Sequence, residues 1–224
     1  MNIKSNGHEH EFEPAFGLPE PLPKGEQILW QGAPDFKDMA LRVFHIRKVA
    51  IYFAVMIASR GIYLSVTGAS VFEVAKGVLL VTLLAAIALG ALATLAWLTA
   101  RTTAYTLTDQ RVVMRIGIVL TLTFNLPLKR LSTAGLQVTR GGFGDIPLAL
   151  NGGDRIGWLN LWPHARPWHI AKPEPMLRCI PQAQAVATQL QQAWTAINGP
   201  GAAAATVPPS AVDTATPQWQ AKLT

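Results

Sequence analysis

Residues 161–169, LWPHARPWH, place two tryptophans, two histidines and an arginine within nine positions. Pro163 and Pro167 interrupt the hydrogen-bond ladders of helices and strands, so this stretch is predicted to be a loop. Imidazoles can ligate the metal of a cofactor, whereas tryptophan and arginine are the residue types that dominate binding interfaces. The loop is therefore a cofactor ligand set, a structural plug, or a docking surface.

The structural and docking interpretations of this loop are compatible with each other. Tryptophan rings can pack on the open end of a folded body, and proline rigidity lowers the entropy lost when a partner binds. We expect Trp158 and Trp162 to point inward. Arg166, Trp168 and His169 are expected to point outward. The candidate partner-binding residues of the loop are Trp162, His164, Arg166, Trp168 and His169.

The other reactive residues do not form a catalytic pattern. Cys179, the single cysteine, is predicted to be a small buried residue rather than a nucleophile. His8 and His10 in HEHEFE (8–13) could hold a divalent metal, but a solvated acidic tail facing a basic partner is favoured. The sequence contains no P-loop, nucleophile elbow or dinucleotide-binding fingerprint. We therefore expect a protein that is not an enzyme and has no cofactor or metal site.

The composition indicates a membrane protein. Half of the 224 residues are hydrophobic and 14% are charged, whereas roughly 25% are charged in a typical soluble domain. The formal net charge of +6 is uneven, because residues 1–36 are net −4 and residues 101–180 are net +6. A basic surplus beside apolar segments favours an anionic lipid surface or an acidic protein as partner, and not nucleic acid.

Two apolar stretches predict a transmembrane helical hairpin. Residues 49–66 are apolar apart from Arg60 and small polar residues, and they make a helix of about 27 Å, just enough for a bilayer core. Residues 77–100 contain no charge. Ser70 and Glu73 have the spacing of a capping box that opens the second helix.

Basic residues beside the two spans predict their orientation. Arg42, Arg47 and Lys48 precede the first span and Arg101 follows the second, whereas the connecting loop offers only Lys76. Both termini are therefore expected in the cytoplasm, in a multi-pass protein of the inner or intracytoplasmic membrane. The four flanking cations are also candidate contacts for anionic lipid headgroups.

Arg60 has two interpretations. It lies six residues before the end of the first span, which favours a side chain that reaches the headgroups of the opposite leaflet. In the alternative, it pairs within the membrane with a carboxylate or carbonyl of another protein. Arg60 is therefore a candidate partner-binding residue as well.

The segment after the hairpin is predicted to be a β-rich body capped by a helix. Strands are expected at residues 102–108, 111–116, 118–126, 136–139, 146–150 and 155–162. Pro181 opens an amphipathic helix that stops at Gly199. Its apolar stripe consists of Ala183, Val186, Ala187, Leu190, Trp194 and Ile197. This order predicts an α+β fold: a two-helix transmembrane hairpin plus a small β-barrel or sandwich capped by a C-terminal helix.

These patterns divide the chain into four regions. Residues 1–36 are predicted to be an acidic, proline-rich cytoplasmic tail, and residues 37–101 the juxtamembrane segment and hairpin. Residues 102–198 form the cytoplasmic body. Residues 199–224 are rich in alanine and proline and are predicted to be disordered.

Several motifs resemble known families. GEQILWQGAPD (25–35), a helical hairpin, YTLTDQRVVMRIG (105–117) and LTFNLPLKRL (122–131) resemble the bacterial pleckstrin-homology-like (PH-like) membrane proteins. HEFEPAFGLPEPLPKGEQILWQG (10–32) and LWPHARPWHIAKPEPMLRCIP (161–181) resemble more closely the PuhB family of photosynthetic-complex assembly proteins of purple bacteria. The latter resemblance covers roughly residues 8–197. It implies a membrane-anchored PH-like domain that helps to build the reaction centre, as a homodimer.

The resemblance also implies partners. The protein would hold reaction-centre subunits, which carry bacteriochlorophyll, or an early subcomplex of the reaction centre with its light-harvesting antenna. His164 or His169 could ligate the pigment magnesium, but such a ligand is expected in an apolar helical bundle rather than on a proline-broken loop. The alternative function is a general PH-like membrane scaffold for anionic lipid or unrelated membrane proteins. Eukaryotic PH domains hold phosphoinositides with a basic first hairpin, which here offers Arg111 and Arg115.

Overall fold

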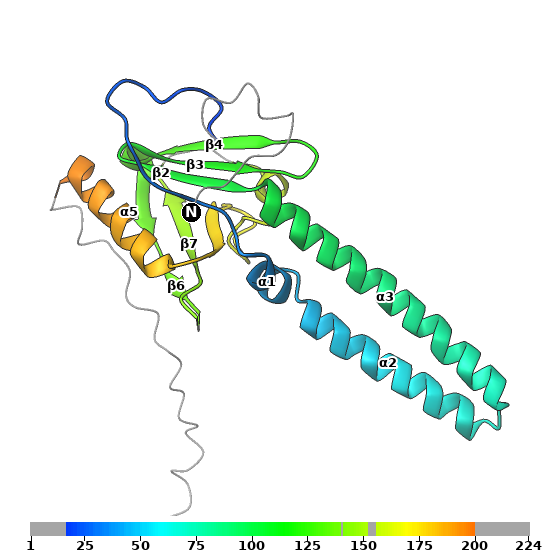
Figure 1. Cartoon of the computed structure of the whole chain (residues 1–224). Coiled ribbons are helices and arrows are strands. Elements are labelled where there is room, and N and C mark those ends of the chain that lie inside the picture. Colours follow the sequence, from blue (N-terminus) through cyan, green and yellow to red (C-terminus); the bar gives the residue numbers. More distant parts are fainter. Residues whose placement is uncertain (1–16, 140, 152–155, 200–224) are drawn as a thin grey trace, which may run out of the picture.

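Two long antiparallel helices project from one side of a β-rich body (Figure 1). The computed structural model describes residues 17–139, 141–151 and 156–199, so the HEHEFE stretch, the NGGD turn after Asn151 and the C-terminal tail after Gly199 lie outside the described residues. The helices are α2 (Ile46–Val66) and α3 (Val71–Thr102), and both are long and apolar enough to cross a membrane. The predicted hairpin is therefore present, with both helices longer than the predicted spans.

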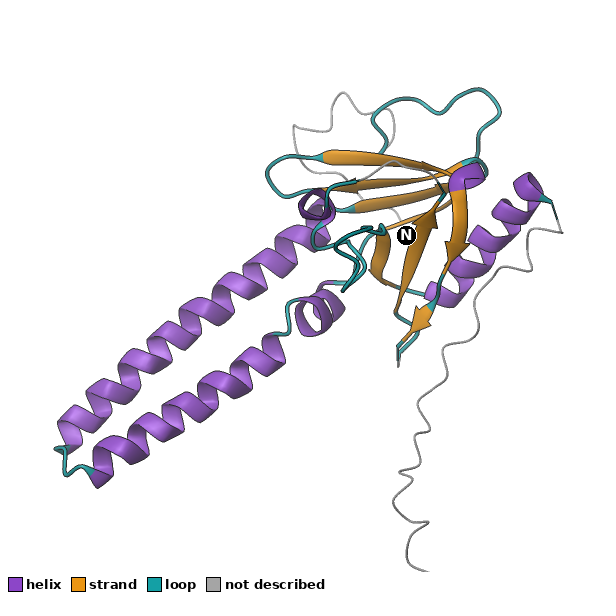
Figure 2. Cartoon of the chain, turned by 180° about the vertical axis from the view of Figure 1, so that it is seen from behind, coloured by secondary structure: helices purple, strands orange, loops and turns teal. Residues whose placement is uncertain are grey.

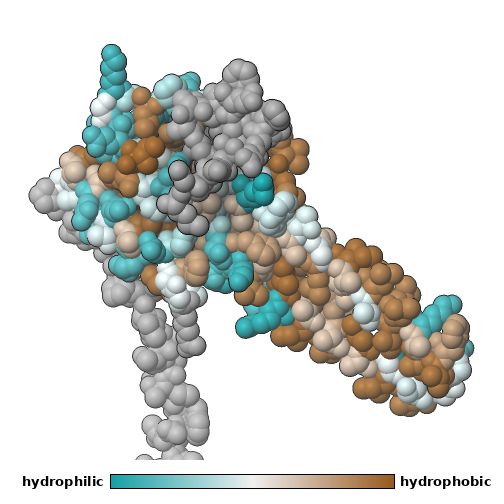
Figure 3. Space-filling view, viewed as in Figure 1, coloured by the Kyte–Doolittle hydropathy of each residue, from teal (hydrophilic) through white to brown (hydrophobic). Residues whose placement is uncertain are grey.

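The sharp reversal between α2 and α3 rests on the predicted capping box. The Ser70 backbone N–H donates to Glu73 Oε2 at 2.8 Å, and the Glu73 N–H donates to Ser70 Oγ at 3.3 Å. This reciprocal pair satisfies backbone donors that the first turn of α3 would otherwise leave unpaired. Apolar side chains cover the outer surface of both helices, whereas polar residues gather at the far end of the hairpin (Figure 3).

The first sheet has four antiparallel strands. In spatial order they are β1 (Ile28–Gly32), β2 (Ala104–Thr108), β3 (Arg111–Ile116) and β4 (Leu122–Pro127). The prediction that residues 1–36 form a tail is wrong for β1, because Gly32 pairs with Tyr105 at the edge of this sheet. The helical hairpin is thus inserted between two paired strands, β1 and β2.

The second sheet runs roughly across the first (Figure 2). It contains β5 (Leu131–Ala134), β7 (Gly144–Leu150) and β6 (Gln137–Val138) in that order, and β8 (Met176–Ile180) also pairs with β7. A short 3₁₀ turn, η3 (Leu128–Arg130), connects the two sheets. The helix α5 (Ala183–Asn198) contacts η3, β7 and β1. This arrangement confirms the α+β fold class with a capping C-terminal helix.

The core lies between the two sheets and α5. The predicted stripe of α5 faces it: Ala183, Val186, Leu190 and Trp194 are buried, and Ala187 and Ile197 are partly buried against the same cluster. The Trp194 indole N–H donates to the Leu131 carbonyl at 3.1 Å, which satisfies its one polar group inside the core.

Four elements of the second half of the chain differ from the predictions. Residues 158–161 form the short helix α4 (Trp158–Leu161) and not a strand, because Leu161 fills the core from the helical spacing i, i+3. β4 starts at residue 122 and not at 118, because the chain turns at Gly117, whose φ is 123°. A Cβ at Gly117 would lie 2.0 Å from the Leu120 carbonyl oxygen. β5 and β8 were not predicted.

Candidate partner-binding site at the base of the hairpin

A polar clamp fixes the chain between β1 and α2 to the body. This segment contains α1 (Phe36–Asp38) and the π-helical turn η2 (Met39–Val43). Arg42 contacts Asp38 at 2.8 Å within the segment and Asp145 of β7 at 2.7 Å. The other Asp145 carboxylate oxygen accepts the Cys179 backbone N–H at 2.7 Å. We call Arg42, Asp38 and Asp145 the juxtamembrane clamp.

The electrostatics of the clamp make it a strong contact. Burial lowers the pKa of Arg42, but the hydrogen bond to Asp38 and the charge of Asp145 raise it above its ordinary value. Asp145 is buried, and its ion pair with this guanidinium offsets the cost of removing the carboxylate from water. Arg42 was predicted to contact lipid headgroups. That prediction is corrected, because its donors are engaged by two carboxylates of the protein.

Apolar packing beside the clamp extends to the helical hairpin. Met39 and Phe44 pack with Ala96 of α3 and Cys179 of β8 in a small buried cluster. Burial raises the pKa of the Cys179 thiol to about 12, in agreement with the predicted buried, unreactive cysteine. The clamp and this cluster together hold α3 and the juxtamembrane segment against the second sheet.

The other predicted headgroup contacts remain available. Arg47 and Lys48 are exposed on the first turn of α2. Arg101 lies over the Trp97 ring at 5.4 Å from its centre, on the last turns of α3. These three cations surround the base of the hairpin, at the level where positively charged and aromatic residues gather at membrane surfaces.

His164 lies at the centre of a buried hydrogen-bond chain. Its Nδ1 is 2.6 Å from the Tyr105 hydroxyl, and its Nε2 is 3.1 Å from Thr103 Oγ1. The Arg178 backbone N–H donates to the Tyr105 hydroxyl, so that hydroxyl can donate to Nδ1, leaving Nε2–H to donate to Thr103. This series of hydrogen bonds joins the loop to the end of α3 and to β2.

Burial determines the protonation states of His164 and Tyr105. His164 is 0% exposed, and burial, with the nearby charge of Arg178, lowers its pKa to about 3. Burial likewise raises the pKa of Tyr105 well above its ordinary value. His164 was predicted as a partner contact. That prediction is corrected, because the neutral ring is inaccessible and both of its nitrogens are already hydrogen-bonded.

The outer half of the loop projects from the body, and contacts with a later segment of the chain brace it. Arg166 pairs with Glu174 through its guanidinium at 2.7 Å and through its backbone N–H at 2.9 Å, and Ala165 bridges to Pro175. Beyond this brace Trp168 is 95% exposed with a φ of 66°. His169 hydrogen-bonds to the Pro167 carbonyl at 3.0 Å. A large aromatic residue held outward in left-handed backbone conformation costs free energy and gains no packing contact within the fold, so Trp168 stays a candidate partner-binding residue.

Trp162 differs from its predicted orientation. Its side chain is 47% exposed, and its ring meets Phe44 edge-on with 5.9 Å between ring centres. Trp158 is partly buried against the core, as predicted, and the neighbouring Leu161 is fully buried there. Phe44 lies two residues before α2, so Trp162 stands beside the start of the helical hairpin. The exposed apolar residues of this region are Leu159, Trp162, Trp168 and Ile170, which we call the loop patch.

Two further predicted residues lie away from the loop patch. Arg60 stands near the far end of α2, with its guanidinium 6.0 Å from the centre of the Tyr63 ring. Arg111, considered above for headgroup binding, instead pairs with Glu26 at 2.8 and 3.0 Å. Within the described parts of the chain, no group of three or more His, Cys, Asp and Glu side chains is placed to hold a metal.

Comparison with known proteins agrees with this architecture. Residues 52–194 match the bacterial PH domain family, and the chain belongs to that family. The chain is also 41% identical over 201 residues to an "uncharacterized 23.7 kDa protein in puhA 5'region" of Rhodobacter capsulatus. That match covers 88% of this chain and 94% of the relative. No solved structure matches the chain.

Proposed function

We propose that this protein is a non-catalytic, membrane-anchored assembly factor for the bacterial photosynthetic reaction centre. The observation that carries the proposal is the similarity to a relative named for its place in the puhA 5' region, which extends over 88% of this chain. The resemblance of residues 10–32 and 161–181 to the PuhB family of assembly proteins supports the same function. The segment 161–181 contains the exposed and braced part of the loop.

In this proposal two surfaces act together. The outer faces of α2 and α3 would cover apolar surface of a reaction-centre subunit within the inner or intracytoplasmic membrane. The loop patch and Arg166 would hold the same subunit or early subcomplex at the cytoplasmic side. The juxtamembrane clamp keeps the two surfaces in a fixed relation, which lowers the entropy lost on binding.

The test is capture of the partner from membranes. The tagged full-length protein is purified in mild detergent from photosynthetically grown cells, and the captured proteins and the absorption spectrum are recorded. We expect reaction-centre subunits in the eluate. Capture should be lost with the double change Arg166→Ala, Trp168→Gly and retained with Arg47→Ala. Eluates that contain no reaction-centre subunit, from several growth stages, would refute the proposal.

A general PH-like membrane scaffold is the second candidate function. The exposed cations Arg47, Lys48 and Arg101 at the base of the hairpin favour it, because they would meet anionic headgroups. This candidate predicts capture of membrane proteins unrelated to photosynthesis, from cells with and without the photosynthetic apparatus. The assembly factor, by contrast, should capture its partners only from cells that make reaction centres.

A further inference from the structure

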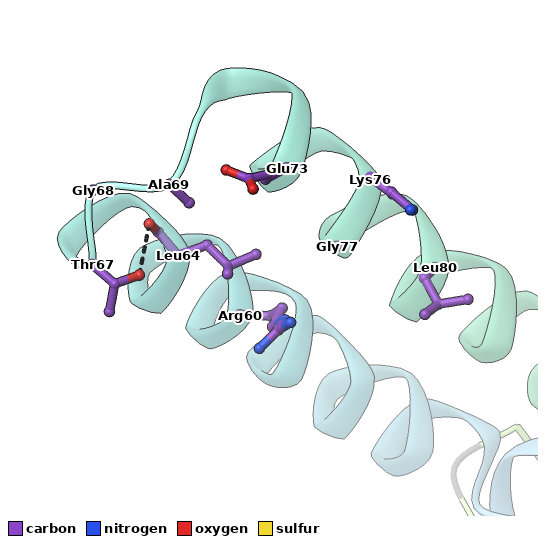
Figure 4. A pocket seen from close by; sticks show the side chains of 9 residues that line it. All are labelled: Arg60, Leu64, Thr67, Gly68, Ala69, Glu73, Lys76, Gly77 and Leu80. Carbon is purple, nitrogen blue, oxygen red and sulfur yellow. Dashed lines mark hydrogen bonds between the residues drawn. The ribbon is translucent and has the colours of Figure 1, made fainter.

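The end of the hairpin remote from the body contains a hollow between α2 and α3 (Figure 4). Its volume is about 460 Å³. Arg60 of α2 and Lys76 of α3 supply positive charge to its lining, and Leu64 and Leu80 supply an apolar wall. The hollow therefore combines two cations with an aliphatic surface.

A glycine allows Leu64 to approach α3 closely beside Arg60. A Cβ at Gly77 would lie 2.6 Å from Leu64 Cδ1, which is too close, and 3.5 Å from Arg60 Nε, which is ordinary contact, so the Arg60 guanidinium lies next to the α3 backbone. Within the described chain, Arg60 and Lys76 form no ion pair with a carboxylate. The guanidinium donors are thus free to bind an anion.

Glu73, the one acidic residue of the lining, is already engaged. Its Oε2 accepts hydrogen bonds from the Ser70 backbone N–H at 2.8 Å and from the Ser70 hydroxyl at 2.9 Å. The formal charge of the lining is +1 with Arg60, Lys76 and Glu73 all ionised. An anion is therefore the ligand that this charge favours.

We propose that this hollow binds the phosphate of an anionic phospholipid in the leaflet opposite the body. The inference rests on the proposed insertion of the hairpin. In that position the hollow lies where α2 ends and the headgroups begin. Leu64 lies between Arg60 and the turn, and Leu80 continues α3 toward the acyl region. Arginine matches phosphate with two parallel hydrogen bonds, and lysine adds a point charge. The lipid would complete the polar end of the hairpin.

The experiment measures lipid retention by the purified full-length protein, without any protein partner. The protein is reconstituted with phosphatidylglycerol or phosphatidylcholine, extracted, and examined by native mass spectrometry. We expect one retained phosphatidylglycerol per chain and little phosphatidylcholine. The double change Arg60→Gln, Lys76→Gln should lower retention by at least roughly tenfold, because the loss of a single charge-assisted hydrogen bond already has about that effect. The matched control Lys129→Gln, which removes an exposed cation of the β-rich body, should retain the lipid.

Further measurements distinguish a bound lipid from free phosphate, and a failure of lipid binding from a failure of insertion. Inorganic phosphate at millimolar concentration should not displace the lipid, and displacement would mean that the hollow takes free phosphate instead. Equal retention by the double variant and the wild type would overturn the proposal. So would equal binding of the two lipids. Alkaline extraction of each variant shows whether the hairpin is inserted, so a failure of insertion is recognised separately from a failure of lipid binding.

Discussion

His164 was selected from the sequence for its chemistry, and the structure gives it a packing role with a pH dependence. Its pKa is lowered from 6.5 to about 3 in the folded state. Above pH 6.5 the ring is neutral in both the folded and the unfolded state, so the titration of His164 does not lower the stability. Below pH 6.5 the unfolded chain gains a proton that the folded chain excludes, and stability falls until about pH 3. At pH 5 the expected loss is about 2 kcal/mol.

Thermal unfolding of the full-length protein in detergent at pH 8 and pH 5 measures this effect. His164→Gln should be less stable at pH 8, because Gln cannot reproduce both hydrogen bonds, but it should lose less stability between the two pH values. His169→Gln is the matched control, because His169 lies on the same loop with a partly exposed ring. An unchanged pH dependence in His164→Gln would contradict the assignment.

Trp168 permits a test that separates binding from folding. Glycine tolerates the φ of 66° that Trp168 adopts, so Trp168→Gly should leave the amount of protein in the membrane unchanged or raise it. Capture of reaction-centre subunits should fall by roughly thirty-fold, which corresponds to about 2 kcal/mol. Quantitative immunoblots of membranes and of eluates measure the two quantities.

The fully buried Leu161 is the comparison for that variant. Leu161→Ala should cost about 2–5 kcal/mol of stability and lower the amount of protein in the membrane. Trp162→Ala should cost less, because its ring is half-exposed. If Trp168→Gly lowered the amount of protein as strongly as Leu161→Ala, the loop would be structural and docking would belong to another surface.

At the scale of elements, the juxtamembrane clamp joins η2 to β7. Removing the guanidinium with Arg42→Ala leaves Asp145 buried with only the Cys179 N–H as a partner, which should cost about 3 kcal/mol of stability. Adding Asp145→Asn should recover part of this loss, because the amide oxygen can still accept from Cys179. Thermal unfolding of the single and double variants measures the recovery. Arg47→Ala, on the exposed first turn of α2, should unfold like the wild type.

Elements with a local pattern were predictable from the sequence, and elements completed by distant partners were not. The hairpin, the β2–β3 pair and α5 follow from apolar length, alternation and helical periodicity within each segment. β1 was interpreted as a tail because its partner strand lies beyond the whole hairpin. In β8, MLRCI, four of five residues are buried, so it lacks the alternation that identifies a strand with one exposed face.

In the candidate site, too, features that depend on local sequence were predictable and contacts between distant residues were not. The exposure of Trp168 was predictable, because prolines and a braced loop leave an aromatic residue few places to pack. The burial of His164 was not, because Tyr105 and Thr103 lie about sixty residues away in the sequence. Arg42 and Asp145 are separated by 103 positions, and no spacing indicates that they meet.

At the scale of the whole molecule, the orientation in the membrane remains a prediction. Arg47, Lys48 and Arg101 lie at the base of the hairpin, so both termini are expected in the cytoplasm. Reporter fusions at the N-terminus and after residue 198 should both give a cytoplasmic signal. A periplasmic signal from either fusion would contradict the proposed function, because the loop patch would then face the wrong compartment.

The insertion of the hairpin between β1 and β2 affects the order in which the protein can be made. In an ordinary β-hairpin a few residues bring the two strands together, whereas here residues 33–103 must be arranged before Gly32 can meet Tyr105. Closing so long a loop by chance is entropically unfavourable, but two antiparallel helices in a bilayer return the chain to its starting side without that search. A nascent chain whose helices fail to insert would therefore leave β2 with an unpaired edge, which is an aggregation risk. With the hairpin inserted as we propose, completion of the sheet would depend on correct integration into the lipid, and a finished body would mark a chain that has already entered the membrane.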